Sequence, residues 1–178
     1  MRNVTRSLGR FGLALGLMIV SVVVSGSATG RSTVAPQASG PCALLTIDDI
    51  QSLAPNTKIA DGLATSFDLG YSACRYTWGT GFNHYTLDVT VGEASRMFAG
   101  MQPDLVKPAL QALVTVGTAD ALIPELGDAA IFKADSQVYV CATAYLKSRI
   151  LQVRLDGSDA RDKKDQVIAL LKTAASRF

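Results

Sequence analysis

Residues 127–155, GDAAIFKADSQVYVCATAYLKSRILQVRL, contain the pattern that decides the fold. They hold three apolar runs, at residues 127–133, 137–146 and 150–155. The two breaks between these runs are three residues long, which suits hairpins between neighbouring antiparallel strands. We therefore predict three consecutive antiparallel strands in this part of the chain.

Two further strands are predicted upstream, at residues 72–78 and 85–91. In the second of them, every other position is apolar or aromatic: Tyr85, Leu87, Val89 and Val91. Such alternation is typical of a half-buried strand. It puts Asp88 on the polar face, where we expect a solvated charge. In the first strand, Cys74, Tyr76 and Trp78 share one face by the same spacing.

Helices are predicted before, between and after these strands. Thr46 with Asp49 three residues on forms a variant of the capping box, which favours a helix start. Pro103 and Pro108 divide the second helical segment, because proline interrupts a helix. The predicted segments are residues 46–54, 93–116 with a break near Gln102, and 158–176.

These elements predict a single α+β domain over residues 42–178. The domain has an antiparallel sheet of about five strands with helices packed on it, in the order α-β-β-α-β-β-β-α. Residues 55–70 are expected to be irregular. A domain of this length can bury a substantial apolar core without a metal ion.

Residues 1–28 have the pattern of a secretory signal peptide. Arg2, Arg6 and Arg10 precede the uncharged apolar run 11–24, and small residues follow it. An apolar run of 14 residues spans about 21 Å as a helix, less than the ~30 Å hydrocarbon core of a bilayer. We therefore predict export, with cleavage after Gly26 or Ala28, although a retained anchor remains an alternative.

The segment after the expected cleavage site, residues 29–41, is rich in Ser, Thr, Gly, Ala and Pro and is predicted to be a disordered linker. Cys42 is the first cysteine, but it lies far beyond the apolar run and follows Pro41. A lipidation site needs a small residue before its cysteine. We therefore expect a secreted or cell-envelope protein that is not lipidated and not stably inserted in the membrane.

The charge of the expected mature chain argues against nucleic acid as a partner. Residues 1–28 hold three of the 17 basic residues and none of the 15 acidic ones, so 14 basic residues face 15 acidic ones in the remainder. Affinity for nucleic acid comes largely from neutralising phosphates. A nearly neutral domain offers little of that attraction.

The chain has three cysteines, Cys42, Cys74 and Cys141, which allow at most one intramolecular disulfide. Export makes such a bond expected. We favour Cys42–Cys74, which would tie the first helix to the sheet, with Cys74–Cys141 as the alternative. Cys141 lies in an apolar run and is typical of a buried small residue.

The aromatic hairpin around residues 76–85 is the candidate binding site, with Trp78, Phe82, His84 and Tyr85 as possible partner-binding residues. Aromatic side chains are enriched at interface hot spots, but in a hairpin they more often fill a core. His84 is the only histidine, and no cysteine or second histidine stands at metal-ligand spacing from it. We expect no metal, no cofactor and no catalytic residue.

Three short motifs resemble a broad group of exported actinobacterial proteins and lipoproteins of unknown function. They are PCALLT at residues 41–46, CRYTW at 74–78 and LGDAA at 126–130. The resemblance covers about residues 41–178 and implies a small α+β domain in the cell envelope, related in part to extracellular sensor domains of receptor kinases. It also implies that the two matched cysteines pair.

The function predicted from these observations is a non-enzymatic exported domain that binds a protein, an envelope component or a small ligand. One alternative is a small secreted hydrolase that uses Asp128 or His84. Another is a structural envelope protein, an effector or an inhibitor. The oligomeric state stays open.

Overall fold

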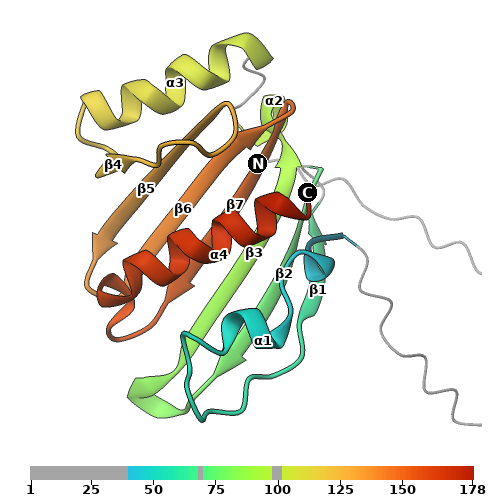
Figure 1. The fold of residues 1–178 in the computed structure, drawn as a ribbon, viewed down its shortest axis with the longest axis vertical. Helices are drawn as coiled ribbons and strands as arrows, with labels where there is room; N and C mark the ends of the chain where they lie inside the picture. Colours follow the sequence, from blue (N-terminus) through green and yellow to red (C-terminus); the bar gives the residue numbers. More distant parts are fainter. Residues whose placement is uncertain (1–39, 68–69, 98–101) are drawn as a thin grey trace, which may run out of the picture. The chain divides into compact units, whose positions relative to one another are not determined.

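The computed structural model describes residues 40–67, 70–97 and 102–178. Its main feature is a seven-stranded antiparallel sheet with the strand order β1-β2-β3-β7-β6-β5-β4 (Figure 1). The strands are β1 (Leu63–Phe67), β2 (Tyr71–Trp78), β3 (Tyr85–Glu93), β4 (Ala121–Leu122), β5 (Ala129–Ser136), β6 (Tyr139–Leu146) and β7 (Arg149–Asp156). The predicted α+β class with an antiparallel sheet is confirmed. The expected signal peptide and residues 29–39 of the expected linker lie outside the described residues.

The predicted number of five strands is wrong, because β1 and β4 were not expected. β1 lies in the segment 55–70 that we expected to be irregular, and its sequence LATSF has no apolar alternation. It is an edge strand with mostly exposed side chains, so its pairing with β2 leaves no burial pattern to find. β4 has two residues, which is too short for any period to be visible.

The order of the helices differs in detail from the predicted one. They are α1 (Ile47–Ile50), α2 (Ala94–Met97), α3 (Pro103–Thr115) and α4 (Lys164–Ser176), with the 3₁₀ helices η1 (Gly40–Ala43), η2 (Gly81–Asn83) and η3 (Ala160–Lys163). Thr46 caps α1 in a complete capping box with Asp49, as predicted. The predicted break near Gln102 is also confirmed, since Gln102 is the N-cap of α3. η3 occupies the start of the segment 158–176, so the last α-helix begins later than expected.

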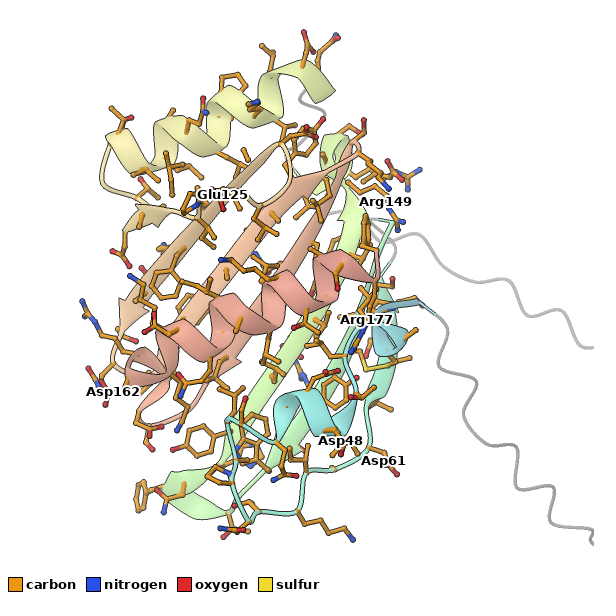
Figure 2. All side chains as sticks on the ribbon, in the orientation of Figure 1. Asp48, Asp61, Glu125, Arg149, Asp162 and Arg177 are labelled. Atoms are coloured by element: carbon orange, nitrogen blue, oxygen red, sulfur yellow. A yellow bond between two sulfur atoms is a disulfide. The ribbon has the colours of Figure 1, made fainter. Side chains whose placement is uncertain are left out.

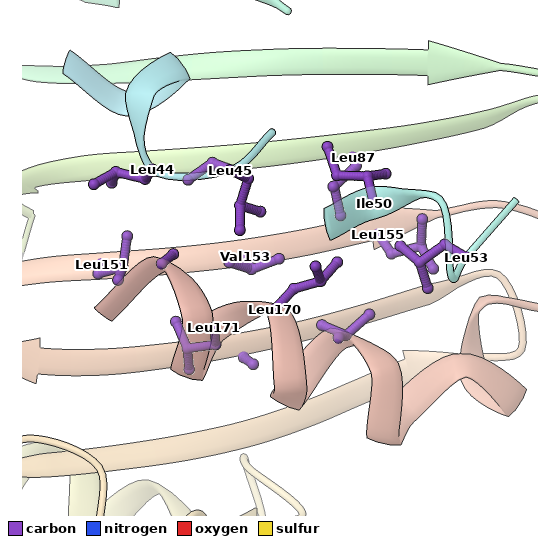
Figure 3. Packing of buried hydrophobic residues seen from close by; sticks show 14 of the residues in the cluster. Leu44, Leu45, Ile50, Leu53, Leu87, Leu151, Val153, Leu155, Leu170 and Leu171 are labelled. Carbon is purple, nitrogen blue, oxygen red and sulfur yellow. The ribbon is translucent and has the colours of Figure 1, made fainter. Parts of the chain in front are cut away.

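One face of the sheet carries the main hydrophobic core. In Figure 1, α4 and α1 lie over this face, which is turned toward the viewer. Leu87 of β3 and Val153 of β7 point into the core from the sheet, while Leu170 and Leu171 come from α4 (Figure 3). All four side chains are buried. Burial of this apolar area is the main stabilising contribution to the domain.

The opposite face is covered by a helix over only part of its width. Val106 and Leu110 of α3 are buried against Ile131 of β5 and Ile150 of β7, in a second and smaller apolar cluster. Over β1, β2 and β3 the same face carries mostly exposed or half-buried polar side chains, such as Thr65, Arg75 and Asp88. The strands β2, β3 and β7 therefore have one apolar face and one mainly polar face.

The first described residues are tied to the sheet and to the C-terminus. Cys42 and Cys74 form a disulfide, which confirms the favoured pairing, and Cys141 is a free, buried thiol. Tyr76 donates a hydrogen bond of 2.7 Å to the carbonyl oxygen of Leu45. Arg177 lies at the C-terminal end of α4 (Figure 2) and pairs with Asp49. These contacts fix η1 and α1 on the core face.

Candidate functional site

On the sheet face opposite the main core, two adjoining cavities form a trough. The first, which we call the α3 cavity, has a volume of about 320 Å³ and lies between α3 and the strands β5, β6 and β7. The second, which we call the arginine hollow, has about 420 Å³ and lies over β1, β2, β3 and β7. Gln152 of β7 lines both cavities and marks where they meet. Hollows of this size are typical of small-molecule sites.

The arginine hollow is built from a row of side chains that the strand register places beside one another. Arg75 of β2 is the partner of Asp88 on β3, and Asp88 is the partner of Arg154 on β7. Arg75 binds both carboxylate oxygens of Asp88, with N···O distances of 2.7 and 2.9 Å. Arg154 binds both oxygens of Asp156 at the same two distances. The two guanidinium groups are therefore held in fixed positions by bidentate contacts.

Asp88 is not the solvated charge that the sequence predicts. Its side chain is 13% exposed, whereas that of Arg75 is 56% exposed. The contact with Asp88 raises the pKa of Arg75, because the carboxylate accepts hydrogen bonds from the guanidinium and attracts its charge. Asp88 therefore anchors Arg75 and leaves the outer part of that side chain accessible.

The α3 cavity has an apolar wall and a polar end. Leu110, Leu113 and Ala119 line it from α3 and the loop that follows, while Ile131 and Ile150 line it from the sheet. The polar end consists of Lys133, Tyr139, Cys141, Thr143 and Gln152.

A short hydrogen-bonded network fixes the polar end of this cavity. Gln152 donates to the hydroxyl oxygen of Thr143 over 3.1 Å, and the thiol of Cys141 lies 3.6 Å from the same oxygen. Tyr139 lies under the guanidinium of Arg154, which is 4.8 Å from the ring centroid. Burial raises the pKa values of both Tyr139 and Cys141, so both groups carry their protons at neutral pH.

The predicted aromatic site divides into a buried part and an exposed part. Trp78 is 5% exposed and belongs to the main core, where its ring stacks on that of Tyr85 with centroids 5.5 Å apart. Tyr85 is half-buried and donates a hydrogen bond of 2.6 Å to Asp159. Burial alone would raise the pKa of Asp159, but the hydrogen bonds from Tyr85 and Lys163 lower it. These contacts join the hairpin to the start of η3.

Phe82 and His84 form the exposed part of the hairpin. Phe82 is 99% exposed in η2, at the tip of the β2–β3 connection, and His84 follows it on the surface. Gly79 makes the tight turn before them: its φ is +76°, and a Cβ at this position would lie 1.9 Å from the carbonyl oxygen of Asn83. The prediction that Trp78, Phe82, His84 and Tyr85 bind a partner stays a prediction.

The two residues proposed for a hydrolase lie at opposite ends of the sheet. Asp128 precedes β5 at the end where β3 finishes, since Ala129 is in register with Tyr145, Ile150 and Gly92. His84 precedes Tyr85 at the start of β3. The residues between these ends of β3 span about 23 Å at the usual rise per residue. Neither Asp128 nor His84 is among the residues that line the trough.

Two further properties concern only residues 40–67, 70–97 and 102–178. Within these ranges the acidic, cysteine and histidine side chains form no group of three or more that could hold a metal ion. The helices within the same ranges are too short or too polar to cross a membrane.

The trough could be predicted only in part from the sequence. The register of the β2–β3 hairpin brings Arg75 beside Asp88, and a pair this local is predictable from the sequence. The position of Arg154 depends on the pairing of β3 with β7, which are separated by more than 50 residues. No local pattern indicates that pairing.

Function depends on the geometry of a site and not on the fold alone, since unrelated functions recur on the same fold. Its main features are the α3 cavity, the fixed arginine pairs and the exposed tip of the aromatic hairpin. Comparisons of this chain with protein-family models, with curated proteins and with solved structures found no match.

Proposed function

We propose that this chain is an exported, non-enzymatic domain of the cell envelope or the extracellular medium that binds a small ligand in the trough. The observation that carries the proposal is the hollowed polar face of the sheet, where two cavities share Gln152. A sheet face with rigidly paired arginines, an apolar wall and a hydrogen-bonding end combines the features by which proteins fix a small molecule.

Export is supported by two independent features. The arginines before the uncharged run 11–24 have the order of a secretory signal. The Cys42–Cys74 disulfide is typical of proteins that fold in oxidising compartments. The resemblance of the motifs around Cys42, Cys74 and Gly127 to exported actinobacterial proteins agrees with residence in the envelope.

Export is tested by mass spectrometry of the protein from the medium and the envelope of producing cells. We expect a chain that starts at residue 27 or 29 and carries one disulfide. Recovery of the full-length chain from the cytosol with three free thiols would refute export.

Ligand binding is tested by screening small metabolites and envelope fragments against the oxidised protein by thermal shift, followed by NMR mapping. Two variants locate the site. Gln152→Trp puts a large ring where the two cavities meet, whereas Phe82→Ser changes only the exposed hairpin tip. We expect Gln152→Trp to abolish binding and Phe82→Ser to retain it. The opposite result would move the site to the hairpin and refute the trough.

A further inference from the structure

We propose that the α3 cavity binds a small amphipathic carboxylate, with its apolar body between α3 and the sheet and its carboxylate at Lys133. This inference rests on the proposed function and names the class of ligand. It follows from the shape of the cavity, from the chemistry of its two ends and from the charges around it.

The apolar wall sets the body of the ligand. Leu110 and Leu113 of α3 line the cavity together with Ile131 and Ile150 of the sheet, and Ala119 lines the wall beside them. The volume of about 320 Å³ is at the lower end of the range for ligand sites. An unbranched or lightly branched hydrocarbon chain fits such a slot better than a sugar, because a sugar would leave hydroxyl groups unpaired against leucine and isoleucine.

The polar end sets the charge of the ligand. Lys133 is the one ionised side chain among the described residues that line this cavity. The other polar groups there are the hydroxyl of Tyr139, the thiol of Cys141, the hydroxyl of Thr143 and the amide of Gln152, all of which can donate hydrogen bonds. A carboxylate accepts hydrogen bonds and carries the opposite charge to Lys133, so it complements this end. An ammonium group would be repelled by the like charge of Lys133.

The ion pairs of the trough explain why the carboxylate goes to Lys133 and not to an arginine. Arg75 and Arg154 are each held by two short contacts to Asp88 and Asp156, so a ligand would have to displace a bidentate partner. Lys133 makes one contact of 3.0 Å with Asp135, whose side chain is 62% exposed. A surface pair of this kind is weak, and a ligand can replace it at little cost.

The test is a titration of the oxidised full chain with octanoate, followed by NMR and calorimetry below the concentration at which the probe forms micelles. We expect saturable binding of one octanoate per chain, with shifts at Leu110, Leu113 and Ile150. Affinity should rise about fourfold for each methylene from hexanoate to octanoate, because each one leaves water. Octylamine and octanol have the same body without the anion and should bind at least tenfold more weakly.

Two variants and one control separate the parts of the proposal. Lys133→Met should weaken octanoate about tenfold and leave octanol unchanged, since only the charged contact is removed. Leu113→Trp should block both probes by filling the cavity. Lys172→Met removes an exposed lysine from α4, on the other face, and should change neither.

Three results would overturn this inference: equal binding of octylamine and octanoate, an unchanged affinity in Lys133→Met, or no dependence on chain length. If carboxylates fail but a neutral ligand binds and is blocked by Leu113→Trp, the ligand class is wrong and the binding function stands. If no ligand of any class binds in the trough, so that Gln152→Trp changes nothing, both fail.

Discussion

Asp49 is the residue whose ionisation most clearly affects the stability of the domain. Its carboxylate accepts hydrogen bonds of 2.7 Å from both the amide and the hydroxyl of Thr46, and it also pairs with Arg177. The hydrogen bond from Arg177 is the largest influence, and it holds the pKa of Asp49 far below its ordinary value, against the opposing effect of burial. The folded state therefore keeps this carboxylate ionised at a pH where the unfolded chain binds a proton.

The sign of the pH dependence follows from that difference. The stabilisation is fully present above about pH 4, the ordinary pKa of an aspartate, and it is lost as the pH falls toward the folded-state value. We expect Asp49→Asn to lower the free energy of unfolding by about 1 kcal/mol at pH 7. The difference from the wild type should shrink at pH 3. Urea denaturation at both pH values measures this effect.

The neighbouring residue Asp48 provides a matched control in the same helical turn. Asp48 is exposed in the first turn of α1, so Asp48→Asn should change the free energy of unfolding by less than about 0.5 kcal/mol. Equal effects of the two substitutions, or an undiminished difference at pH 3, would show that the Arg177 contact does not hold the carboxylate.

At the scale of elements, the Cys42–Cys74 bond joins η1 to β2 across a sequence separation of 32 residues. Closing a loop of this length stabilises the folded state by about 3–4 kcal/mol in the chain-entropy account. We expect the double substitution Cys42→Ser with Cys74→Ser to lower the free energy of unfolding by about this amount, as measured by urea denaturation.

Thiol titration provides the control for this prediction. The native protein should react slowly, because Cys141 is buried and burial raises its pKa. After unfolding without reductant one thiol should react, and with reductant all three should. Three reactive thiols without reductant would contradict the bond. So would loss of the one reactive thiol in the Cys74→Ser variant instead of in the Cys141→Ser variant.

The β2–β3 hairpin contains one aromatic residue that is buried in the core and one that is exposed. Trp78 is packed in the core and stacked on Tyr85, so Trp78→Ala should lower the free energy of unfolding by about 3 kcal/mol or more. Phe82 is on the surface, so Phe82→Ser should leave it within about 0.5 kcal/mol of the wild type. Denaturation curves of the two variants test this, and similar losses for both would mean that the tip packs against the domain.

The elements also show what a sequence can and cannot reveal. The strands β3 and β7 were predicted from the apolar pattern of their core-facing sides, and β6 was predicted from an apolar run, because it is buried on both faces. β1 leaves none, since its backbone pairs with β2 while the side chains of residues 63–66 are exposed. The α3 cavity was not predicted either, because its lining comes from α3 and three strands whose packing no local pattern encodes.

At the scale of the whole domain, the helices on the two faces of the sheet differ in how many apolar side chains they bury. α4 packs on the main core through Val167, Leu170, Leu171 and Ala174, all of which are buried. α3 buries Val106 and Leu110 in the smaller cluster, and Leu113 and Val114 are only partly buried. Pro108 lies inside α3 and cannot donate a backbone hydrogen bond there.

We therefore expect α3 to open locally without unfolding of the sheet. Local opening is favoured where few apolar side chains are buried, and it is reported by amide hydrogen exchange. The amides in the centre of α3 and in its last turn, from Val114 onward, should exchange about tenfold or more faster than the amides of α4. Equal protection of the two helices across a range of denaturant concentrations would show that they unfold together.

The same measurement connects the stability of α3 with the cavity beneath it. A ligand that contacts Leu110 and Leu113 binds only the closed form, so it must reduce the population of the open one. Exchange in α3 should slow in proportion to the fraction of cavity filled by octanoate. Amides of α4 that exchange only through unfolding of the whole domain should slow by the same factor, because the unfolded chain also lacks the site. If exchange in α3 is unchanged when octanoate is bound, the ligand does not contact the closed form of this helix.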